Sequence, residues 1–441
     1  MRIEHTMLRA ALRLALAGGL LVAAVANAAL PIQRWQTRQG AQVQFVEEHA
    51  LPMLDVQLDV AAGNAYDPAG KAGLADLVVQ NLNDGTAQRD EQTLARALAD
   101  VGAVLTAHTG QDRATVALRT LSAAEARTAA TGVLTEILQS PAFPAAAFER
   151  ERARSLATLQ ESLAQADGLA ERAFYPRLFP GHGYGAVISP ESLQAIQRDD
   201  LDRFYRARYR APGAVLTLVG DLSRAEAERL AEQLAAALPA GPAAALLTAP
   251  TEAVQAGEIR IDHPGTQAHI LLGQQGMAFG DPDYAALMVA NYVLGGGGFS
   301  SRLTDEVREK RGLTYGVTST FTPLAHGGMF SIQLETRRDQ AQQALALVRK
   351  VLADFVAQGP TEAELRDAKR YLVGSFPLRL DSNHKQLDFI SSMGFHHLPA
   401  DWREAYPRQM AAVTLAQVRD AIRRRLHPDQ LLTVVVGGEA R

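Results

Sequence analysis

Residues 196–221 read IQRDDLDRFYRARYRAPGAVLTLVGD, which is a helix-like stretch followed by a proline turn, an apolar strand-like run and a glycine. Residues 413–438 read VTLAQVRDAIRRRLHPDQLLTVVVGG and follow the same order. Proline ends a helix, and a short apolar run bounded by glycine is typical of a strand. Helix–turn–strand units are common enough to recur by accident. An internal repeat of this kind nevertheless predicts a chain built from two related halves.

Earlier segments of the two halves correspond as well. Residues 113–119 (RATVALR) alternate like a half-buried strand and precede an expected helix over residues 123–138. Residues 328–335 (GMFSIQLE) likewise precede an expected helix over residues 338–355. Strands and helices thus mix without the strict alternation of a doubly wound parallel sheet. We expect an α+β layer sandwich in each half.

The length of 441 residues also favours more than one domain, because one hydrophobic core rarely organises more than about 300 residues. Residues 235–257 are rich in Ala, Pro and Gly and poor in charge, as extended spacers are. We predict an N-terminal domain over residues 29–240, a linker over residues 241–257 and a C-terminal domain over residues 258–441.

The first 28 residues have the parts of a secretory signal peptide. Three arginines precede an apolar run over residues 14–25, which closes on ANA at residues 26–28. We expect cleavage before Ala29 and a periplasmic protein. No later stretch reaches about 18 uninterrupted apolar residues, so we expect no membrane span after cleavage.

The composition excludes several classes of function. A chain with 47% apolar and 21% charged residues is globular in type. Its net charge of -4, with both signs interspersed, offers no basic stripe for a nucleic-acid backbone. The chain has no cysteine, so it has neither a thiolate metal site nor a cysteine nucleophile.

The most informative stretch of the first half is NAYDPAGKAGLADLVVQNLNDGT, residues 64–86. Four apolar residues at helical spacing predict a buried helix over residues 74–82: Leu74, Leu77, Val78 and Leu82. The stretch resembles the pitrilysin (M16, insulinase-like) family of zinc peptidases. Members of that family reach a helix bearing His-x-x-Glu-His through Tyr-Asp-Pro and Lys-x-Gly-Leu.

The resemblance implies a degenerate metal site. Asp76 and Gln80 stand where the family has its two histidines, and Val79 stands where it has the glutamate that accepts a proton. A third zinc ligand follows about 75 residues downstream in the family, which places Ala157 or Thr158 at that position. Glu161 lies about one turn away and leaves a rescued site open. We expect no metal in this chain and zinc in a partner subunit.

The second half carries GGGGFSSRLTDEVREKRGLTYG, residues 295–316. Three apolar residues mark a buried helix stripe, Leu303, Val307 and Leu313, and Gly312 is expected to end that helix. The segment resembles the one that follows the glycine-rich loop in the family's second domain. There, an arginine and a tyrosine seven positions apart face the zinc of another domain. Arg308 and Tyr315 have that spacing.

The family resemblance implies roles for this segment. Tyr315 would donate a hydrogen bond to the carbonyl oxygen of a scissile amide as negative charge develops there. Arg308 would hold a neighbouring peptide carbonyl with its planar fork of donors. The glycines would let peptide backbone approach closely, and they lack the Gly-Lys-Ser/Thr ending of a phosphate loop: Gly295, Gly296, Gly297 and Gly298.

The resemblance covers nearly the whole chain after the leader and implies two homologous α/β-sandwich domains of the LuxS/MPP-like metallohydrolase type. It also implies a non-catalytic subunit of a heterodimeric, periplasmic zinc metallopeptidase that acts on peptides or unfolded segments. Such a chain is expected to be inactive alone. Two alternatives remain: an inactive pseudopeptidase that binds peptides or scaffolds the cell envelope, and a stand-alone peptidase with an altered metal site.

Overall fold

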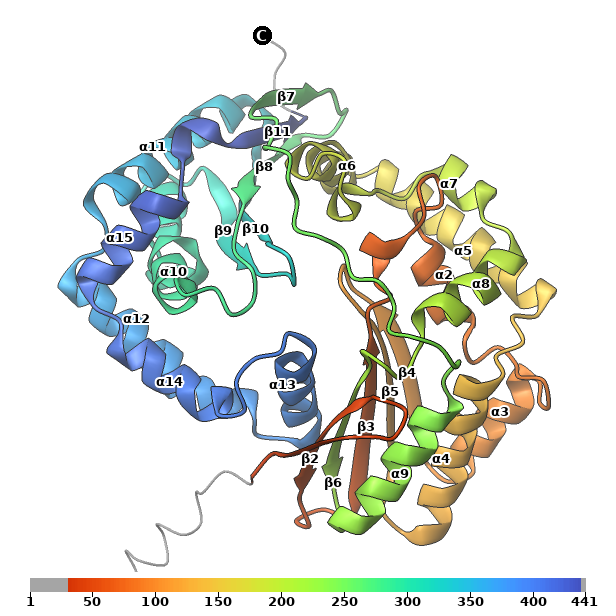
Figure 1. The fold of residues 1–441 in the computed structure, drawn as a ribbon. Coiled ribbons are helices and arrows are strands. Elements are labelled where there is room, and N and C mark those ends of the chain that lie inside the picture. The colour runs from red at the N-terminus through yellow and green to blue at the C-terminus, as the bar shows by residue number, and fades with distance from the viewer. Residues whose placement is uncertain (1–30, 438–441) are drawn as a thin grey trace, which may run out of the picture.

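A computed structural model describes residues 31–437, and over these residues the chain folds into two α/β lobes (Figure 1). The N-terminal half forms one lobe and the C-terminal half forms the other. The predicted signal peptide, residues 1–28, lies outside the described residues. Among residues 31–437, no helix combines the length and apolarity needed to cross a bilayer.

The first lobe contains a mixed sheet with the strand order β1-β2-β6-β3-β5-β4. These strands are β1 (Gln33–Gln36), β2 (Gln42–Glu47), β3 (Met53–Val60), β4 (Val104–Thr109), β5 (Ala114–Leu121) and β6 (Val215–Gly220). The helices of this half are α2 (Leu74–Asn81), α3 (Glu91–Ala99), α4 (Ala124–Gln139), α5 (Ala145–Leu163), α6 (Ala166–Leu178), α7 (Pro190–Ala195), α8 (Arg198–Arg208) and α9 (Arg224–Ala237).

The second lobe contains a sheet with the order β7-β11-β8-β10-β9. Its strands are β7 (Gly257–Ile261), β8 (Gln267–Gln275), β9 (Thr314–Thr322), β10 (Met329–Arg337) and β11 (Leu432–Val436). Its helices are α10 (Tyr284–Asn291), α11 (Ala341–Gln358), α12 (Glu362–Gly374), α13 (Asn383–Phe395), α14 (Trp402–Ala412) and α15 (Leu415–Arg425).

Short helical turns connect these elements. The 3₁₀ turns are η1 (Asn64–Tyr66), η2 (Gly183–Gly185), η4 (Gly298–Ser300), η6 (Arg338–Gln340), η7 (Phe376–Arg379) and η8 (Pro428–Gln430). The wider π turns are η3 (Tyr292–Gly296) and η5 (Thr304–Glu309), and both lie in the second half.

Apart from the additional strand β1, the two sheets have the same topology. Strand β2 pairs in parallel with β6, and antiparallel pairs then join β6 to β3, β3 to β5 and β5 to β4. The corresponding pairs of the second sheet are β7 with β11, β11 with β8, β8 with β10 and β10 with β9, in the same orientations. The predicted internal repeat and α+β architecture are therefore confirmed.

Each sheet buries one face against the helices of its own half. In β3 the alternate residues Leu54, Val56 and Leu58 are at most 1% exposed, because side chains alternate between the faces of a strand. The second half has a matching cluster that includes Ile270, Leu272 and Ile332. Burying each such side chain stabilises the fold by about 1.5–3 kcal/mol.

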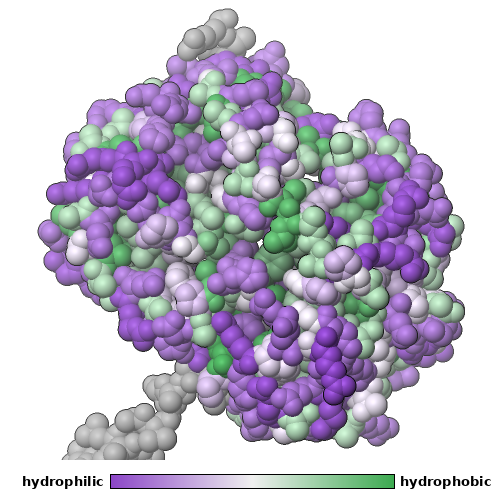
Figure 2. Space-filling model, in the orientation of Figure 1, coloured by the Kyte–Doolittle hydropathy of each residue, from purple (hydrophilic) through white to green (hydrophobic). Residues whose placement is uncertain are grey.

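The opposite face of each sheet is covered by a helix from the other half. Helix α6 packs on β8 and β11, where Phe174 and Leu178 join a cluster with Leu271 and Val434. Gly273 lacks a side chain because a Cβ there would lie 2.6 Å from the Phe174 ring. Figure 1 shows α6 beside the second sheet, and in Figure 2 apolar residues gather near the line where the lobes meet.

Helix α13 makes the reciprocal contact with the first sheet. Its Leu387 and Ile390 pack on Val46 and Val219 of β2 and β6. The Nε2 atom of Gln44 donates a hydrogen bond of 2.7 Å to the carbonyl oxygen of Ile390. Apolar and polar contacts therefore both hold α13 in place.

A buried polar cluster extends the contact between α13 and the first sheet. Asp59 is fully buried and accepts hydrogen bonds from Ser391 of α13 and, at 2.6 Å, from Thr115 of β5. Gln57 donates to Ser391 at 2.7 Å, and Arg113 forms an ion pair of 3.4 Å with Asp59. Because burying an unpaired carboxylate is costly, these partners must stay together in the folded chain.

Candidate functional site

The N-terminus of α2 is held by Asp67. Its two carboxylate oxygens accept hydrogen bonds from the backbone N–H of Gly73 at 2.7 Å and of Ala75 at 2.8 Å. These bonds satisfy donors that have no partner within the helix. The predicted helix over residues 74–82 is confirmed to within one residue at its end.

Asp76 is the first of the degenerate metal positions. It lies in the first turn of α2 and accepts hydrogen bonds from Thr109 of β4 and, at 3.4 Å, from Asn64. Burial raises the pKa of the Asp76 carboxyl. This side chain is therefore engaged with its own lobe through both oxygens.

Val79 and Gln80 lie one turn further along α2. Val79 is 4% exposed and belongs to the core of the first lobe. Gln80 is exposed, and its Oε1 atom accepts a hydrogen bond of 3.3 Å from Ser155 of α5. A valine cannot accept a proton, and an amide is a weak, neutral ligand. This arrangement does not fit zinc.

The prediction that Ala157 or Thr158 stands at the third ligand position stays a prediction. The α5 side chain that contacts Gln80 is Ser155. Glu161 is exposed and six residues beyond Ser155, about 9 Å along the helix, so it does not lie beside Gln80.

Within residues 31–437, no three His, Cys, Asp or Glu side chains converge in a way that could hold a metal ion. Asp76 is the one acid among the three degenerate positions. The described residues at these positions therefore do not provide the imidazole and carboxylate set that a catalytic zinc ion requires.

The segment after the glycine loop folds as expected at its end. Leu303, Val307 and Leu313 are at most 3% exposed. Gly312 adopts a left-handed conformation, with φ of 61°, and β9 begins two residues later. The predicted helix is confirmed in part, because residues 304–309 form the π turn η5. Tyr315 is the second residue of β9.

The structure brings Arg308 and Tyr315 together. The guanidinium carbon of Arg308 lies 5.2 Å from the centre of the Tyr315 ring. It also lies 4.7 Å from the centre of the Phe299 ring, a residue that sequence reasoning had not selected. In the sequence, Phe299 is marked only by its place directly after the four glycines.

The four glycines have different structural surroundings. A Cβ at Gly295 would lie 2.5 Å from the backbone nitrogen of Ser319, so no larger residue fits there. Gly298 has φ of 58°, in the left-handed region that glycine adopts readily. Gly296 and Gly297 pack against Asn291 and Tyr292. Contact between these glycines and a peptide stays a prediction.

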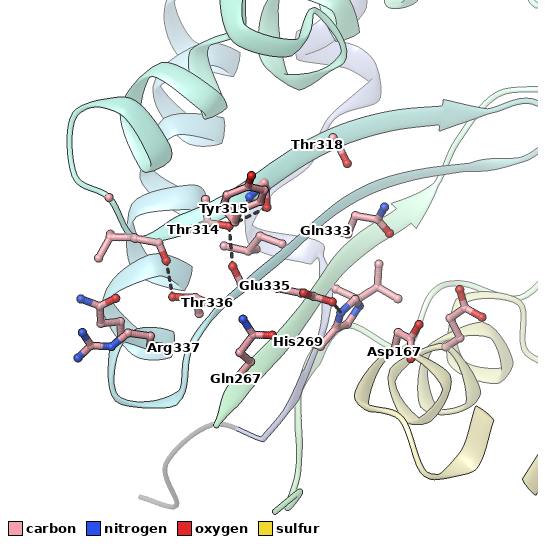
Figure 3. A pocket seen from close by; sticks show the side chains of 17 residues that line it. Asp167, Gln267, His269, Thr314, Tyr315, Thr318, Gln333, Glu335, Thr336 and Arg337 are labelled. Atoms are coloured by element: carbon pink, nitrogen blue, oxygen red, sulfur yellow. Dashed lines mark hydrogen bonds and ion pairs between the residues drawn. The ribbon is translucent and has the colours of Figure 1, made fainter. Parts of the chain in front are cut away.

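A pocket of about 680 Å³ lies beside Tyr315 (Figure 3). It is partly open to solvent and is lined by residues of strands β8, β9 and β10 of the second half and of helix α6 of the first. Figure 3 shows Tyr315 and Thr318 on β9 and Asp167 on α6 across the pocket. His269 and Glu335 lie on its floor, with Nδ1 and Oε1 3.6 Å apart. Tyr315 therefore lines a pocket to which both halves contribute.

Comparison with known protein families yields two matches. A family described as "Insulinase (Peptidase family M16)" matches residues 45–186, and one described as "Peptidase M16 inactive domain" matches residues 195–372. Two relatives extend the similarity over most of the chain. The non-peptidase homolog YmxG of Helicobacter pylori is 28% identical and aligns over 90% of this chain and 92% of its own. The mitochondrial-processing peptidase subunit beta of Blastocladiella emersonii is 26% identical and aligns over 90% of this chain and 87% of its own.

Solved structures agree with these matches. The peptidase M16 inactive domain from Pseudomonas fluorescens is 38% identical, with a TM-score of 0.90, over 93% of this chain and 98% of that one. A protease from Helicobacter pylori has a TM-score of 0.83 over 92% of this chain and 100% of that one. Because it is only 18% identical, it supports the fold alone. The chain therefore belongs to the M16 peptidase family and is similar to members that are named as inactive or non-peptidase.

Proposed function

We propose that this chain is the non-catalytic, substrate-binding subunit of a heterodimeric, periplasmic M16 zinc metallopeptidase. The observation that carries the proposal is the pairing of Arg308 with an 88% exposed Tyr315 beside an open pocket, in a chain whose own metal positions hold Asp76, Val79 and Gln80. The periplasmic location is supported by the signal peptide expected from the sequence. A zinc-bearing homologue of this chain would be the partner.

The two side chains suit complementary tasks. A phenol O–H can donate to the oxygen of an amide carbonyl, where negative charge grows during attack on the peptide bond. A guanidinium fork can hold a second backbone carbonyl and so fix the register of the peptide. Neither group activates water. The chain therefore positions a peptide and stabilises the reacting amide, whereas the nucleophile comes from the partner.

The first test is made with the purified chain. We expect no stoichiometric zinc by elemental analysis and no cleavage of an unfolded peptide. Adding the product of a neighbouring gene that encodes His-x-x-Glu-His should give turnover that exceeds the partner's own. The proposal would be overturned by one tightly bound zinc ion in this chain. It would also be overturned if mixing the chain with the partner left the partner's turnover unchanged.

The second test concerns the two residues themselves. In the mixed assembly, Tyr315→Phe should lower the turnover rate roughly ten to a thousandfold, which is the range for loss of one oxyanion donor. Arg308→Ala should weaken peptide use and leave co-purification with the partner intact. If Tyr315→Phe turns over at the wild-type rate, Tyr315 has no catalytic role. If Arg308→Ala no longer co-purifies with the partner, Arg308 is an interface residue instead.

A peptide-binding pseudopeptidase is the second candidate, because no metal-binding group is found among residues 31–437 and the pocket beside Tyr315 is open. This function predicts that the chain alone binds unfolded peptide and that no partner gains activity from it. Because both candidates require the chain to bind peptide, the measurement that separates them is cleavage of a labelled peptide by the partner with and without this chain.

A further inference from the structure

Arg308 lies against two aromatic rings. Its guanidinium carbon is 4.7 Å from the centre of the Phe299 ring and 5.2 Å from that of Tyr315. Both distances are within the range of about 6 Å over which the face of an aromatic ring attracts a cation. Phe299 therefore interacts with the charge of Arg308 as directly as Tyr315 does.

Packing of the protein core does not explain Phe299. Its side chain is 73% exposed, and Tyr315 is 88% exposed. These are the two most exposed large hydrophobic side chains among residues 31–437. An exposed ring contributes little to folding, since the favourable term is proportional to the apolar area removed from water.

The backbone around Phe299 is fixed. Gly298 adopts φ of 58° immediately before it, and Ser301 is fully buried shortly after it. The hydroxyl of Ser301 donates to the carbonyl oxygen of Gly298 at 2.8 Å and lies 3.0 Å from the hydroxyl of Thr304. This turn ties the loop to η5, the turn that carries Arg308, and so holds the ring near the guanidinium.

Polar contacts do little to fix Arg308. In the described part of the chain, residues 31–437, its guanidinium forms one ion pair, with Glu309 at 3.5 Å, and no hydrogen bond. A single, partly exposed ion pair contributes about 0–1 kcal/mol and does not by itself hold a long side chain in one place. The two rings are therefore the main contacts that can orient this arginine.

We propose that Phe299 is a positioning residue that holds the guanidinium of Arg308 toward a peptide bound beside Tyr315. This role rests on the proposed function, because the peptide is the ligand that Arg308 would meet there. The glycine run has a matching purpose, since it shapes the turn that presents the ring.

The first test reads the arginine directly and needs no peptide. In protein isotope-labelled only in arginine, the Arg308 side-chain resonances are assigned with Arg308→Lys, and we expect them to be rigid and shifted by ring currents. Phe299→Ala should mobilise them, Phe299→Trp should restore them, and Phe299→Leu, which lacks a π face, should not. Unchanged resonances in Phe299→Ala, or full restoration by leucine, would overturn the proposal.

The second test measures binding of a fluorescein-labelled unfolded peptide to the whole chain by anisotropy. Phe299→Ala should weaken binding about two- to fivefold, the range for one exposed cation–π contact. The double variant Phe299→Ala/Arg308→Ala should bind no worse than Arg308→Ala, because Phe299 acts through Arg308. Additive losses would show that Phe299 contacts the peptide itself and would overturn the positioning role.

Two controls complete the design. Leu378→Ala removes a side chain that is 63% exposed outside this segment, and it should change neither affinity nor the Arg308 resonances. Thermal unfolding of every variant should match the wild type. If the wild-type chain binds no peptide, the proposed substrate-binding function fails, whereas the resonances still decide whether Phe299 positions Arg308.

Discussion

The substitutions along α2 remove different parts of a zinc site. Asp76 could still donate an oxygen, but both of its oxygens are engaged by Thr109 and Asn64. Gln80 keeps a polar group at a ligand position and pairs with Ser155 instead of a metal. Where the family has a glutamate that accepts a proton, Val79 has an apolar side chain that packs in the core of the first lobe.

Rebuilding the metal site compares two positions for its third member, Thr158 from the family spacing and Ser155 from its contact with Gln80. The triple variant Asp76→His, Gln80→His and Ser155→Glu should bind about one zinc ion per chain, because two imidazoles one turn apart and a facing carboxylate form a three-ligand zinc site. The matched control carries Thr158→Glu in place of Ser155→Glu and should bind far more weakly. Equal zinc contents by elemental analysis would show that Ser155 does not occupy the ligand position.

A second residue-scale prediction concerns Asp84. The pKa of the Asp84 carboxyl is raised to about 6, mainly by burial and to a lesser extent by the negative charge of nearby Glu91. Between about pH 4 and pH 6 the folded chain keeps a proton here that the unfolded chain has released, so stability falls as the pH rises through this window. The effect is at most about 3 kcal/mol, since one pKa unit corresponds to about 1.4 kcal/mol.

The variant Asp84→Asn removes this titration. Its free energy of unfolding, relative to the wild type, should rise between pH 4 and pH 7 in urea titrations. Asp90→Asn is the control, because the exposed Asp90 carboxyl caps α3 and has a lowered pKa. Asp90→Asn should show no such rise. If the difference in unfolding free energy between Asp84→Asn and the wild type does not change with pH, the raised pKa of Asp84 is contradicted.

At the scale of elements, substitutions in the glycine loop, residues 295–298, test whether close packing within the fold requires glycine there. Gly295→Ala should lower the free energy of unfolding by about 1–3 kcal/mol, because its Cβ would overlap the backbone of Ser319. Gly298→Asn should cost less than about 1 kcal/mol, since asparagine tolerates the left-handed region. Equal losses in urea unfolding would mean that close packing does not explain Gly295.

Elements with a strong local pattern could be predicted from the sequence. The alternation in residues 113–119 reflects one apolar and one more polar face of a sheet, and β5 covers this stretch from Ala114 onward. The helix expected over residues 338–355 corresponds to α11, which starts three residues later because the chain first forms the turn η6. Arg308 and Tyr315 followed from a motif and lie together.

Features that depend on distant residues could not be predicted in this way. The contact of Phe174 with Gly273 joins residues 99 positions apart, and no local periodicity encodes it. The same holds for Ser155, whose place depends on the register of α5 against α2. Phe299 was missed because the value of an exposed ring becomes visible only when a charged neighbour is seen beside it.

For the whole molecule, the exchange of α6 and α13 predicts that the halves stay together without a covalent link. Residues 243–246 include exposed positions between the lobes, where a specific protease site can be inserted. After cleavage, the two fragments should elute as one particle of the uncut mass, because each sheet is covered by a helix from the other half. Separation of the fragments on gel filtration would show that the linker holds the lobes.

A weakened version of the same protein sharpens this test. Phe174→Ala and Ile390→Ala each remove an apolar side chain from one exchanged helix, at a typical cost of about 2–5 kcal/mol. The uncut double variant should remain folded by circular dichroism, whereas the cut form should dissociate. Dissociation should then depend on protein concentration.

The exchanged helices also bear on the origin of the chain. A half-length ancestor with one sheet and one such helix would leave both surfaces bare as a monomer. Two copies related by a twofold axis would satisfy all of these surfaces at once. Duplication and fusion of its gene would convert that self-pairing ancestor into a single polypeptide in one step. From then on, mutations in one copy would no longer be repeated in the other, so the α2 segment and the Arg308 segment could diverge independently.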